Sequence, residues 1–202
     1  MSNSLITKKA LAEALKLLMR KTPFSKLSIA EICSTAGLSR RSFYRHFRDK
    51  YELLNWIYYE DFCVLINRIP LKRSLDMFPF VCRHLYSDRK FYIHAFEVEE
   101  QNSFRSYCAE RLYPHLARDY SSAFQNSYEE HFYIDRIMSG VFDCLQEWLK
   151  AEPCTPPDEF AEQITDSITR FAVLFAKVAT RELPESEEGF EGQSGLLETE
   201  NL

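Results

Sequence analysis

The chain has 202 residues, of which 46 % are hydrophobic and 27 % charged, the composition of an ordinary soluble globular protein. Only five Gly and eight Pro occur, and few segments alternate as strands do, so the sequence favours an all-α fold. The formal net charge of −5 is uneven: residues 1–60 hold eleven Lys and Arg against five Asp and Glu (+6), and residues 61–202 hold fourteen against twenty-five (−11). A basic N-terminal region before an acidic remainder predicts a polyanion-binding domain.

The first sixty residues predict four helices separated by short turns. Leucines spaced at helical intervals mark the first helix, over about residues 7–21. Ser28-Ile-Ala-Glu31 is a capping box that starts the second helix, and Gly37 supplies its left-handed C-terminal cap. Ser39 caps a third helix, SRRSFYRHF, and a fourth begins near Lys50 and runs to about residue 67. Two short helices joined by a tight Gly-containing turn are typical of a helix-turn-helix.

The remaining sequence predicts further helices and no strand. Their expected ranges are 74–87, 89–101, 103–120 with a bend or break at Pro114, 128–150 and 158–182. Residues 184–202 are acidic and contain no basic residue, which predicts a disordered tail. Apolar stripes on the last two helices are compatible with an ordinary core or with a dimer interface.

Positive charge and aromatic residues concentrate in residues 36–50, AGLSRRSFYRHFRDK. Arg40 and Arg41 fall in the first turn of the third helix, where a side chain of a DNA-reading helix reaches base edges. The arginine fork can donate two hydrogen bonds to guanine. Phe43 and Phe47, four residues apart, are expected to face inward and anchor the helix. The alternative interpretation is a solvated basic helix face over packed aromatic side chains.

The segment SIAEICSTAGLSRRSFYRHFRDKYELL, Ser28 to Leu54, resembles the DNA-binding domain of the TetR/AcrR family of bacterial transcriptional regulators. SGVFDCLQEWLKAEPCTPPDEFAEQI and FAVLFAK are similar to the final two helices of one TetR-like subfamily. The resemblance implies a helix-turn-helix domain at residues 1–54 and an effector-binding and dimerisation domain at residues 55–183. It also implies a homodimer formed through the last two helices. By position, the DNA-contacting residues would be Ser28, Arg40, Arg41, Ser42, Tyr44, Arg45, His46 and Lys50.

The middle helices are rich in aromatic residues and would enclose the effector pocket that the resemblance implies. The candidate lining residues are Phe91, Tyr92, His94, Phe96, Tyr107, Tyr113 and Phe142. Such a pocket would suit a small hydrophobic or aromatic effector, because ligand sites are mostly apolar with a few polar groups. The default interpretation of the same residues is a plain aromatic core, and the pocket is the more specific hypothesis.

The sequence therefore predicts a ligand-responsive repressor that binds a palindromic operator in double-stranded DNA as a homodimer. The alternative is a DNA-binding protein of the same fold that a protein partner controls without a small-molecule effector. We expect no enzymatic activity, metal, cofactor or membrane span, because no catalytic motif, ligand spacing or long apolar segment occurs. The expected location is the bacterial cytoplasm, in association with the nucleoid.

Overall fold

The computed structural model describes residues 3–63, 73–98, 103–123 and 126–179. Within these ranges the regular structure is helical and contains no strand, as the sequence predicts. The chain divides into two compact units, Met1–Thr165 and Asp166–Leu202. The boundaries predicted near residues 54 and 183 stay predictions.

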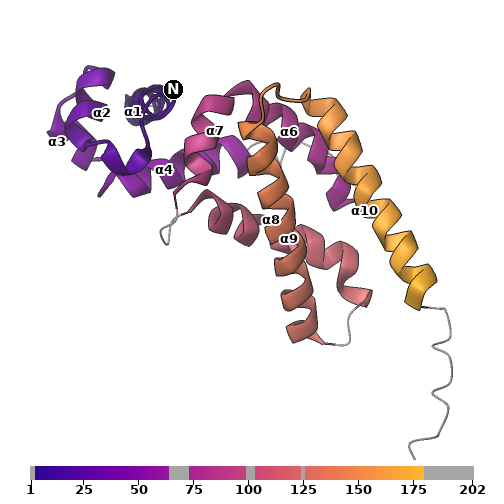
Figure 1. Ribbon diagram of the computed structural model, residues 1–202. Coiled ribbons are helices and arrows are strands. Elements are labelled where there is room, and N and C mark those ends of the chain that lie inside the picture. Colours follow the sequence, from indigo (N-terminus) through magenta and orange to yellow (C-terminus); the bar gives the residue numbers. More distant parts are fainter. Residues whose placement is uncertain (1–2, 64–72, 99–102, 124–125, 180–202) are drawn as a thin grey trace, which may run out of the picture. The chain divides into compact units, whose positions relative to one another are not determined.

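Four helices form the N-terminal part of the first unit. They are α1 (Asn3–Met19), α2 (Ile29–Ala36), α3 (Arg40–Tyr44) and α4 (Lys50–Tyr58), with a 3₁₀ turn, η1 (Phe24–Lys26), before α2. Helices α1, α2 and α3 lie together, and α4 leads from them towards the rest of the unit (Figure 1). A π-helical turn, η2 (Tyr59–Cys63), continues α4.

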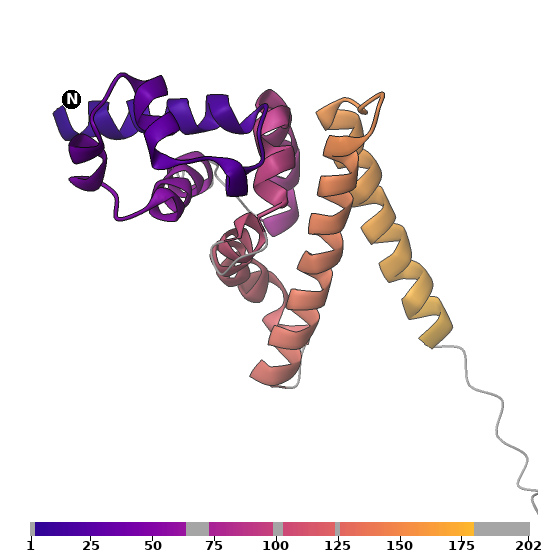
Figure 2. The same ribbon diagram turned by 60° about the vertical axis from the view of Figure 1, so that its left-hand side comes forward.

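The rest of the described chain is also helical. Its elements are η3 (Ser74–Met77), α6 (Phe78–Ser87), α7 (Arg89–Phe96), α8 (Phe104–Tyr120), η4 (Ser121–Ala123), α9 (Ser127–Lys150) and α10 (Pro157–Ala179). Helix α7 packs against α1, α6, α8 and α9, so it joins the N-terminal helices to the remainder of the unit. The view in Figure 2 shows α9 as a long helix beside α8.

Some helix ends differ from the predicted ones. Helix α1 begins at Asn3, four residues before the expected start. Helix α3 ends at Tyr44, although backbone bonds from His46 and Phe47 to the Phe43 carbonyl continue the turn. Helix α7 ends at Phe96, and the predicted residues 99–101 lie outside the described ranges, as do 64–67, 180–182 and the tail 184–202.

The sequence predicts a bend or a break at Pro114, and the break does not occur. Helix α8 continues from Phe104 to Tyr120 with Pro114 inside. A proline removes one backbone donor and usually kinks or ends a helix. Packing of α8 against α4 and α9 holds this segment together, so tertiary contacts outweigh the local cost.

The apolar stripe predicted on the helix at residues 128–150, which is α9, divides into a buried part and an exposed part. Ile134, Met138 and Leu145 are buried in the core of the first unit, whereas Ile137 is 57 % exposed. At the corner between α9 and α10, the rings of Trp148 and Phe160 stack at 4.4 Å with an interplanar angle of 4°. The corner is thus closed by aromatic packing.

Candidate nucleic-acid interface

A complete capping box sets the start of α2. The Ser28 hydroxyl accepts from the Glu31 amide at 3.3 Å, and the Glu31 carboxylate accepts from the Ser28 amide at 2.8 Å. Two of the backbone amides that a helix start leaves without a partner are thereby satisfied. Hydrogen bonds from the Ser28 hydroxyl and amide hold the pKa of Glu31 below its ordinary value. Ser28 is exposed, so the start of this helix faces solvent.

The turn between α2 and α3 depends on one glycine. Gly37 has φ 66° and ψ 28°, and its amide donates to the carbonyls of Cys33 and Ser34. This left-handed conformation suits Gly, which has no Cβ to clash with the neighbouring carbonyl. Two residues later the Ser39 hydroxyl accepts from the Ser42 amide at 3.1 Å and caps α3. The helix-turn-helix predicted from the sequence is therefore formed.

Helix α3 presents arginines on one side and buries aromatic rings on the other. Arg40 and Arg41 are both exposed in its first turn. Phe43 is fully buried and Phe47 is 2 % exposed, with ring centroids 5.9 Å apart. The buried pair fixes the orientation of α3, so the two guanidinium groups project from a rigid base, as predicted.

The other predicted DNA-contacting side chains differ in their solvent exposure and in the hydrogen bonds they already make. Tyr44 is 57 % exposed and Arg45 is exposed beside it. The Ser42 hydroxyl lies 3.1 Å from the Ser39 hydroxyl, and His46 Nδ1 lies 3.4 Å from the Ser4 hydroxyl of α1. These hydroxyl and imidazole groups remain near the surface and can donate to phosphate oxygens.

Lys50, the first residue of α4, is held within the protein. Its ammonium donates to the carbonyl oxygens of Phe24 at 2.9 Å, Ser25 at 3.2 Å and Leu27 at 2.9 Å. All three belong to the segment that precedes α2. The sequence places Lys50 beside the arginine-rich helix, but only the tertiary structure shows these acceptors.

Asp49 caps α4 and stabilises the turn after α3. Its carboxylate accepts from the Glu52 amide at 2.8 Å and from Arg48 Nε at 3.1 Å. Burial opposes ionisation of Asp49, but these hydrogen bonds outweigh it and lower the pKa of its carboxyl. The Arg48 side chain is 83 % exposed and adds a further basic group that the predicted contact set omits.

A second residue that the sequence analysis did not predict, Lys8, contacts the aromatic rings packed beneath the helix-turn-helix. Lys8 of α1 places its ammonium 5.5 Å from the Phe47 ring and 5.9 Å from the Trp56 ring. These rings pack at 6.0 Å, so the cation lies over an aromatic pair that backs α3. A lysine on α1, 39 positions before Phe47, gives no local signal of this contact.

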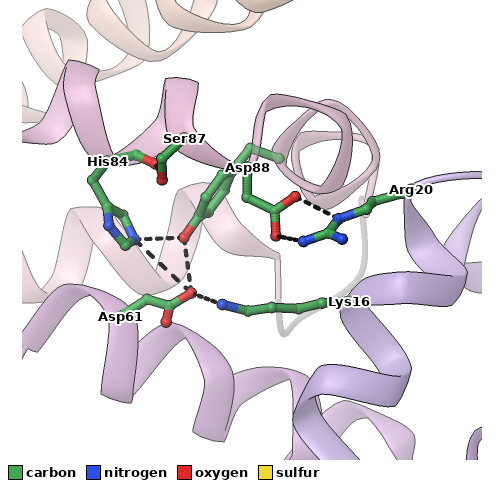
Figure 3. Close-up of polar contacts among 7 residues, drawn as sticks. Lys16, Arg20, Asp61, His84, Ser87 and Asp88 are labelled. Carbon is green, nitrogen blue, oxygen red and sulfur yellow. Dashed lines mark hydrogen bonds and ion pairs between the residues drawn. The ribbon is translucent and has the colours of Figure 1, made fainter.

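A polar network joins α1 to η2, α6 and α7 (Figure 3). One oxygen of Asp61, Oδ2, accepts from Lys16 Nζ at 2.6 Å and from the Tyr92 hydroxyl at 2.9 Å. Since the Tyr92 proton points to Asp61, His84 Nε2, at 2.8 Å, acts as the donor to the Tyr92 oxygen. Arg20, one turn after Lys16, donates two hydrogen bonds to a second carboxylate, Asp88, at 2.8 and 2.9 Å.

The predicted effector-pocket residues do not all lie together. Phe91, Tyr92, Phe96 and Phe142 are buried, and Phe104 contacts Tyr92 and Phe96 at ring distances of 5.4 and 4.9 Å. Tyr107 joins the same cluster through Tyr58. Tyr113 instead donates to Glu130 at 2.7 Å and packs on His131, and His94 pairs with Glu97 at 2.9 Å.

Tyr58 also belongs to this aromatic cluster, although the predicted pocket set omits it. Its side chain is fully buried, and burial raises the pKa of its hydroxyl well above the ordinary value. The ring packs on Phe104 at 4.8 Å, yet the hydroxyl has no hydrogen-bond partner among the described residues. A buried hydroxyl without a partner costs about 1–3 kcal/mol.

Neither a metal cluster nor a membrane-spanning helix appears in the part of the chain that the structure describes. No three His, Cys, Asp or Glu side chains come together there in a way that could hold a metal ion. None of the described helices is both long enough and apolar enough to cross a bilayer.

Two family models match this chain. Residues 10–57 match "Bacterial regulatory proteins, tetR family", and residues 72–170 match "Transcriptional regulator C-terminal region" of the TetR type. Together they span well over half of the sequence and place the helix-turn-helix described above inside the first match. The chain belongs to the TetR family of transcriptional regulators. As a TetR-family regulator, it is a DNA-binding protein that regulates transcription. Members of this family act as dimers.

Similar proteins agree with this assignment. The dhaKLM operon transcriptional activator DhaS of Lactococcus lactis is 42 % identical over 67 residues, which are 33 % of this chain and 36 % of that relative. The match thus spans about a third of the length of DhaS.

Solved structures show the same fold. The dihydroxyacetone kinase operon activator DhaS has a TM-score of 0.60 at 23 % identity and covers 87 % of this TetR-family chain and 97 % of its own. NalD, the secondary repressor of the MexAB-OprM multidrug efflux pump in Pseudomonas aeruginosa, has a TM-score of 0.64 at 19 % identity. The match covers 84 % of this chain and 96 % of NalD.

Proposed function

We propose that this TetR-family protein is a homodimeric repressor that binds a palindromic operator and is released by a small hydrophobic ligand. The observation on which the DNA-binding proposal depends is the exposed pair Arg40 and Arg41 in the first turn of α3, whose opposite face is anchored by Phe43 and Phe47. The basic N-terminal region of an otherwise acidic chain agrees with this role. Its proposed location is the bacterial cytoplasm.

The proposed DNA contacts have two kinds of role. Arg40 and Arg41 read base edges in the major groove, where each bidentate pair with guanine discriminates by about 1–3 kcal/mol. The remaining donors position the helix on the phosphates and carry no sequence information. They are Ser28, Ser42, Tyr44, Arg45, His46 and Lys50, all of them exposed or half-buried.

A matched pair of substitutions separates the two roles. Arg40→Ala is expected to reduce the preference for the operator over unrelated DNA, because a base contact is lost. Arg45→Ala is expected to weaken binding to all duplexes and to reduce the magnitude of the slope of log K against log salt by about 1.8, because the homodimer loses one phosphate contact, worth about 0.9, in each half-site. Fluorescence anisotropy at four salt concentrations measures both quantities. Equal effects of the two substitutions would contradict the assigned roles.

The ligand-response proposal is supported by the unpaired hydroxyl of Tyr58 within the aromatic cluster. A ligand with one hydrogen-bonding group and a planar apolar body would satisfy that hydroxyl and pack on the rings of Phe104 and Tyr107. We expect a panel of planar aromatic acids and phenols to contain a compound that raises the Tm and lowers operator affinity. Tyr58→Phe should reduce both effects, and a panel without any active compound would contradict this proposal.

A protein partner in place of a small molecule is the second candidate. The rings around Phe104 pack at centroid distances of 4.8–5.4 Å, which is typical of a plain core. Tyr128 of α9 is 79 % exposed and Phe132 is 52 % exposed, so aromatic surface is available to a partner. Loss of regulation in Tyr128→Ser, with the ligand panel inactive, would favour this alternative.

A further inference from the structure

Asp61 lies where two connections between the helix-turn-helix and the helices after it meet. The first connection is the chain itself, because α4 follows the helix-turn-helix and continues into η2, the π-helical turn that contains Asp61. The second is α1, whose Lys16 donates to Asp61 Oδ2 at 2.6 Å. π-Helical turns are frequent at functional sites. One carboxylate therefore joins α1 to the turn that ends α4.

The same carboxylate oxygen also accepts a hydrogen bond from α7. Tyr92 donates to it at 2.9 Å, and His84 of α6 lies 2.8 Å from the Tyr92 oxygen (Figure 3). Burial and the neighbouring Asp61 raise the pKa of Tyr92 well above its ordinary value, so the hydroxyl keeps the proton that it donates. The side chains of Lys16 and Asp61 are only 14 % and 17 % exposed, so solvent ions screen their attraction little.

A second ion pair holds α1 one turn further along. Arg20 donates from Nε and from Nη2 to the two oxygens of Asp88, at 2.8 and 2.9 Å, and this paired geometry fixes direction as well as distance. Asp88 lies between α6 and α7. Two ties one turn apart on α1 restrain its rotation as well as its position. Since α1 packs on α2, and α2 packs on α3, the orientation of α3 follows that of α1.

We propose that Asp61 and Asp88 are positioning residues that hold the helix-turn-helix at one angle to α6 and α7, and thereby set the half-site spacing that the dimer accepts. This inference rests on the proposed binding of a palindrome by a homodimer. A rotation of α1 in each protomer would change the distance between the two copies of α3, whereas a palindrome has one distance between its half-sites. Without the ties the protein would sample several orientations, of which only a fraction fit a given operator.

Two substitutions of Lys16 test this role. Lys16→Met keeps the apolar stem and removes the ion pair, whereas Lys16→Arg keeps a charge that can donate to the Asp61 carboxylate. Fluorescence anisotropy compares the selected palindrome, the same palindrome with one or two base pairs inserted or removed at its centre, and a single half-site. We expect Lys16→Met to bind the palindrome several-fold more weakly, to discriminate less between spacings and to bind the half-site as wild type does. Lys16→Arg should keep the wild-type preference.

The matched control is Asp143→Asn. It breaks an ion pair of the same length, 2.6 Å to Arg105, which joins α8 to α9 and shares no residue with the ties of α1. Its spacing preference should equal that of wild type. Circular dichroism at the assay temperature verifies folding, and Arg20→Met, which removes the more exposed tie, replaces Lys16→Met if that variant does not fold.

Two results of the binding experiment would overturn the inference. One is a wild-type spacing preference in the variant that lacks a tie. The other is a loss of half-site binding as large as the loss of palindrome binding, because an isolated half-site does not depend on the distance between two protomers.

A distance measurement without DNA separates this inference from the proposed function. Because the chain has six cysteines, spin labels are attached to keto amino acids, introduced at exposed Thr35 of α2 and Glu110 of α8. With labelled protein diluted in unlabelled protein, electron–electron resonance reports the distance within one protomer. We expect one narrow distribution in wild type and Lys16→Arg, and a broader one in Lys16→Met. Equal widths in all three would overturn the inference. A narrow wild-type distribution without any preference for a palindrome would contradict the proposed function alone.

Discussion

At the scale of single residues, Gly37 shows how one backbone conformation supports the DNA-binding face. Its φ of 66° lies in the left-handed region, and a Cβ added there would meet no heavy atom within 4 Å. Gly37→Ala should therefore destabilise through backbone strain alone, by about 1–2 kcal/mol. Urea unfolding at neutral pH measures this loss.

The control for Gly37 is an asparagine, which visits the left-handed region more readily than alanine does. Gly37→Asn should lose less stability than Gly37→Ala. An alanine variant as stable as the wild type would show that the turn does not need this conformation.

Features set by neighbouring residues could be predicted from the sequence, whereas contacts between distant residues could not. The capping box at Ser28 and the glycine cap at Gly37 were predicted, because each depends on neighbours within four positions. The buried pair Phe43 and Phe47 followed from helical spacing. The three carbonyls around Lys50 lie 23–26 positions away, and no local pattern identifies them.

At the scale of elements, helix types and order followed from the sequence, but several ends did not. Helix α3 is shorter than predicted because the turn after Tyr44 tightens, with His46 bonding to the carbonyl three residues back. The aromatic residues of α7 and α8 were predicted as a group. Their division into a buried cluster and separate polar pairs at Tyr113 and His94 depends on packing between helices, which spacing alone does not determine.

The network that joins α1, η2, α6 and α7 predicts a pH dependence of stability. Burial lowers the pKa of His84; Asp61 and Asp88 act to raise it and Lys16 to lower it, and the net shift is downward. The neutral form is therefore favoured in the folded state, in which His84 donates to Tyr92. The unfolded chain binds more protons between the folded pKa and about 6.5.

The contribution of His84 to the free energy of unfolding is accordingly complete above pH 6.5. It is lost as the pH falls towards the pKa of His84 in the folded protein. We expect the Tm of wild type to fall between pH 7.5 and pH 5.5. In His84→Gln the fall should be smaller, because the amide can still donate to Tyr92 but does not titrate. Differential scanning calorimetry in matched buffers compares the two proteins. If Tm falls with pH by the same amount in both, His84 is not the group responsible.

At the scale of the whole molecule, α9 and α10 each leave apolar side chains exposed. Tyr133, Ile137, Gly140 and Cys144 of α9 follow one another at intervals of four, three and four residues and so share a helix face. Tyr133 and Ile137 are 51 % and 57 % exposed. On α10, Phe171 is 61 % exposed and Leu174 is 56 % exposed, and the proposed dimer would cover these surfaces.

A charge placed on the α9 face tests the proposed dimer interface. Ile137→Asp should convert the dimer into a monomer, because two carboxylates would be buried against apolar surface. Ser139→Asp adds the same charge 200° around the helix and should leave the dimer intact. Analytical ultracentrifugation distinguishes the two. If both variants remain dimeric, the interface lies elsewhere.

The central claim is that the exposed arginines of α3 read a palindromic operator in the context of a dimer. The most direct test is selection of bound duplexes from a random DNA pool at physiological salt, with the Arg40→Ala/Arg41→Ala double variant as control. We predict enrichment of a palindrome with half-sites about one helical turn apart, roughly 34–36 Å, that the control does not enrich. No enrichment, or the same enriched sequence in the control, would contradict the account.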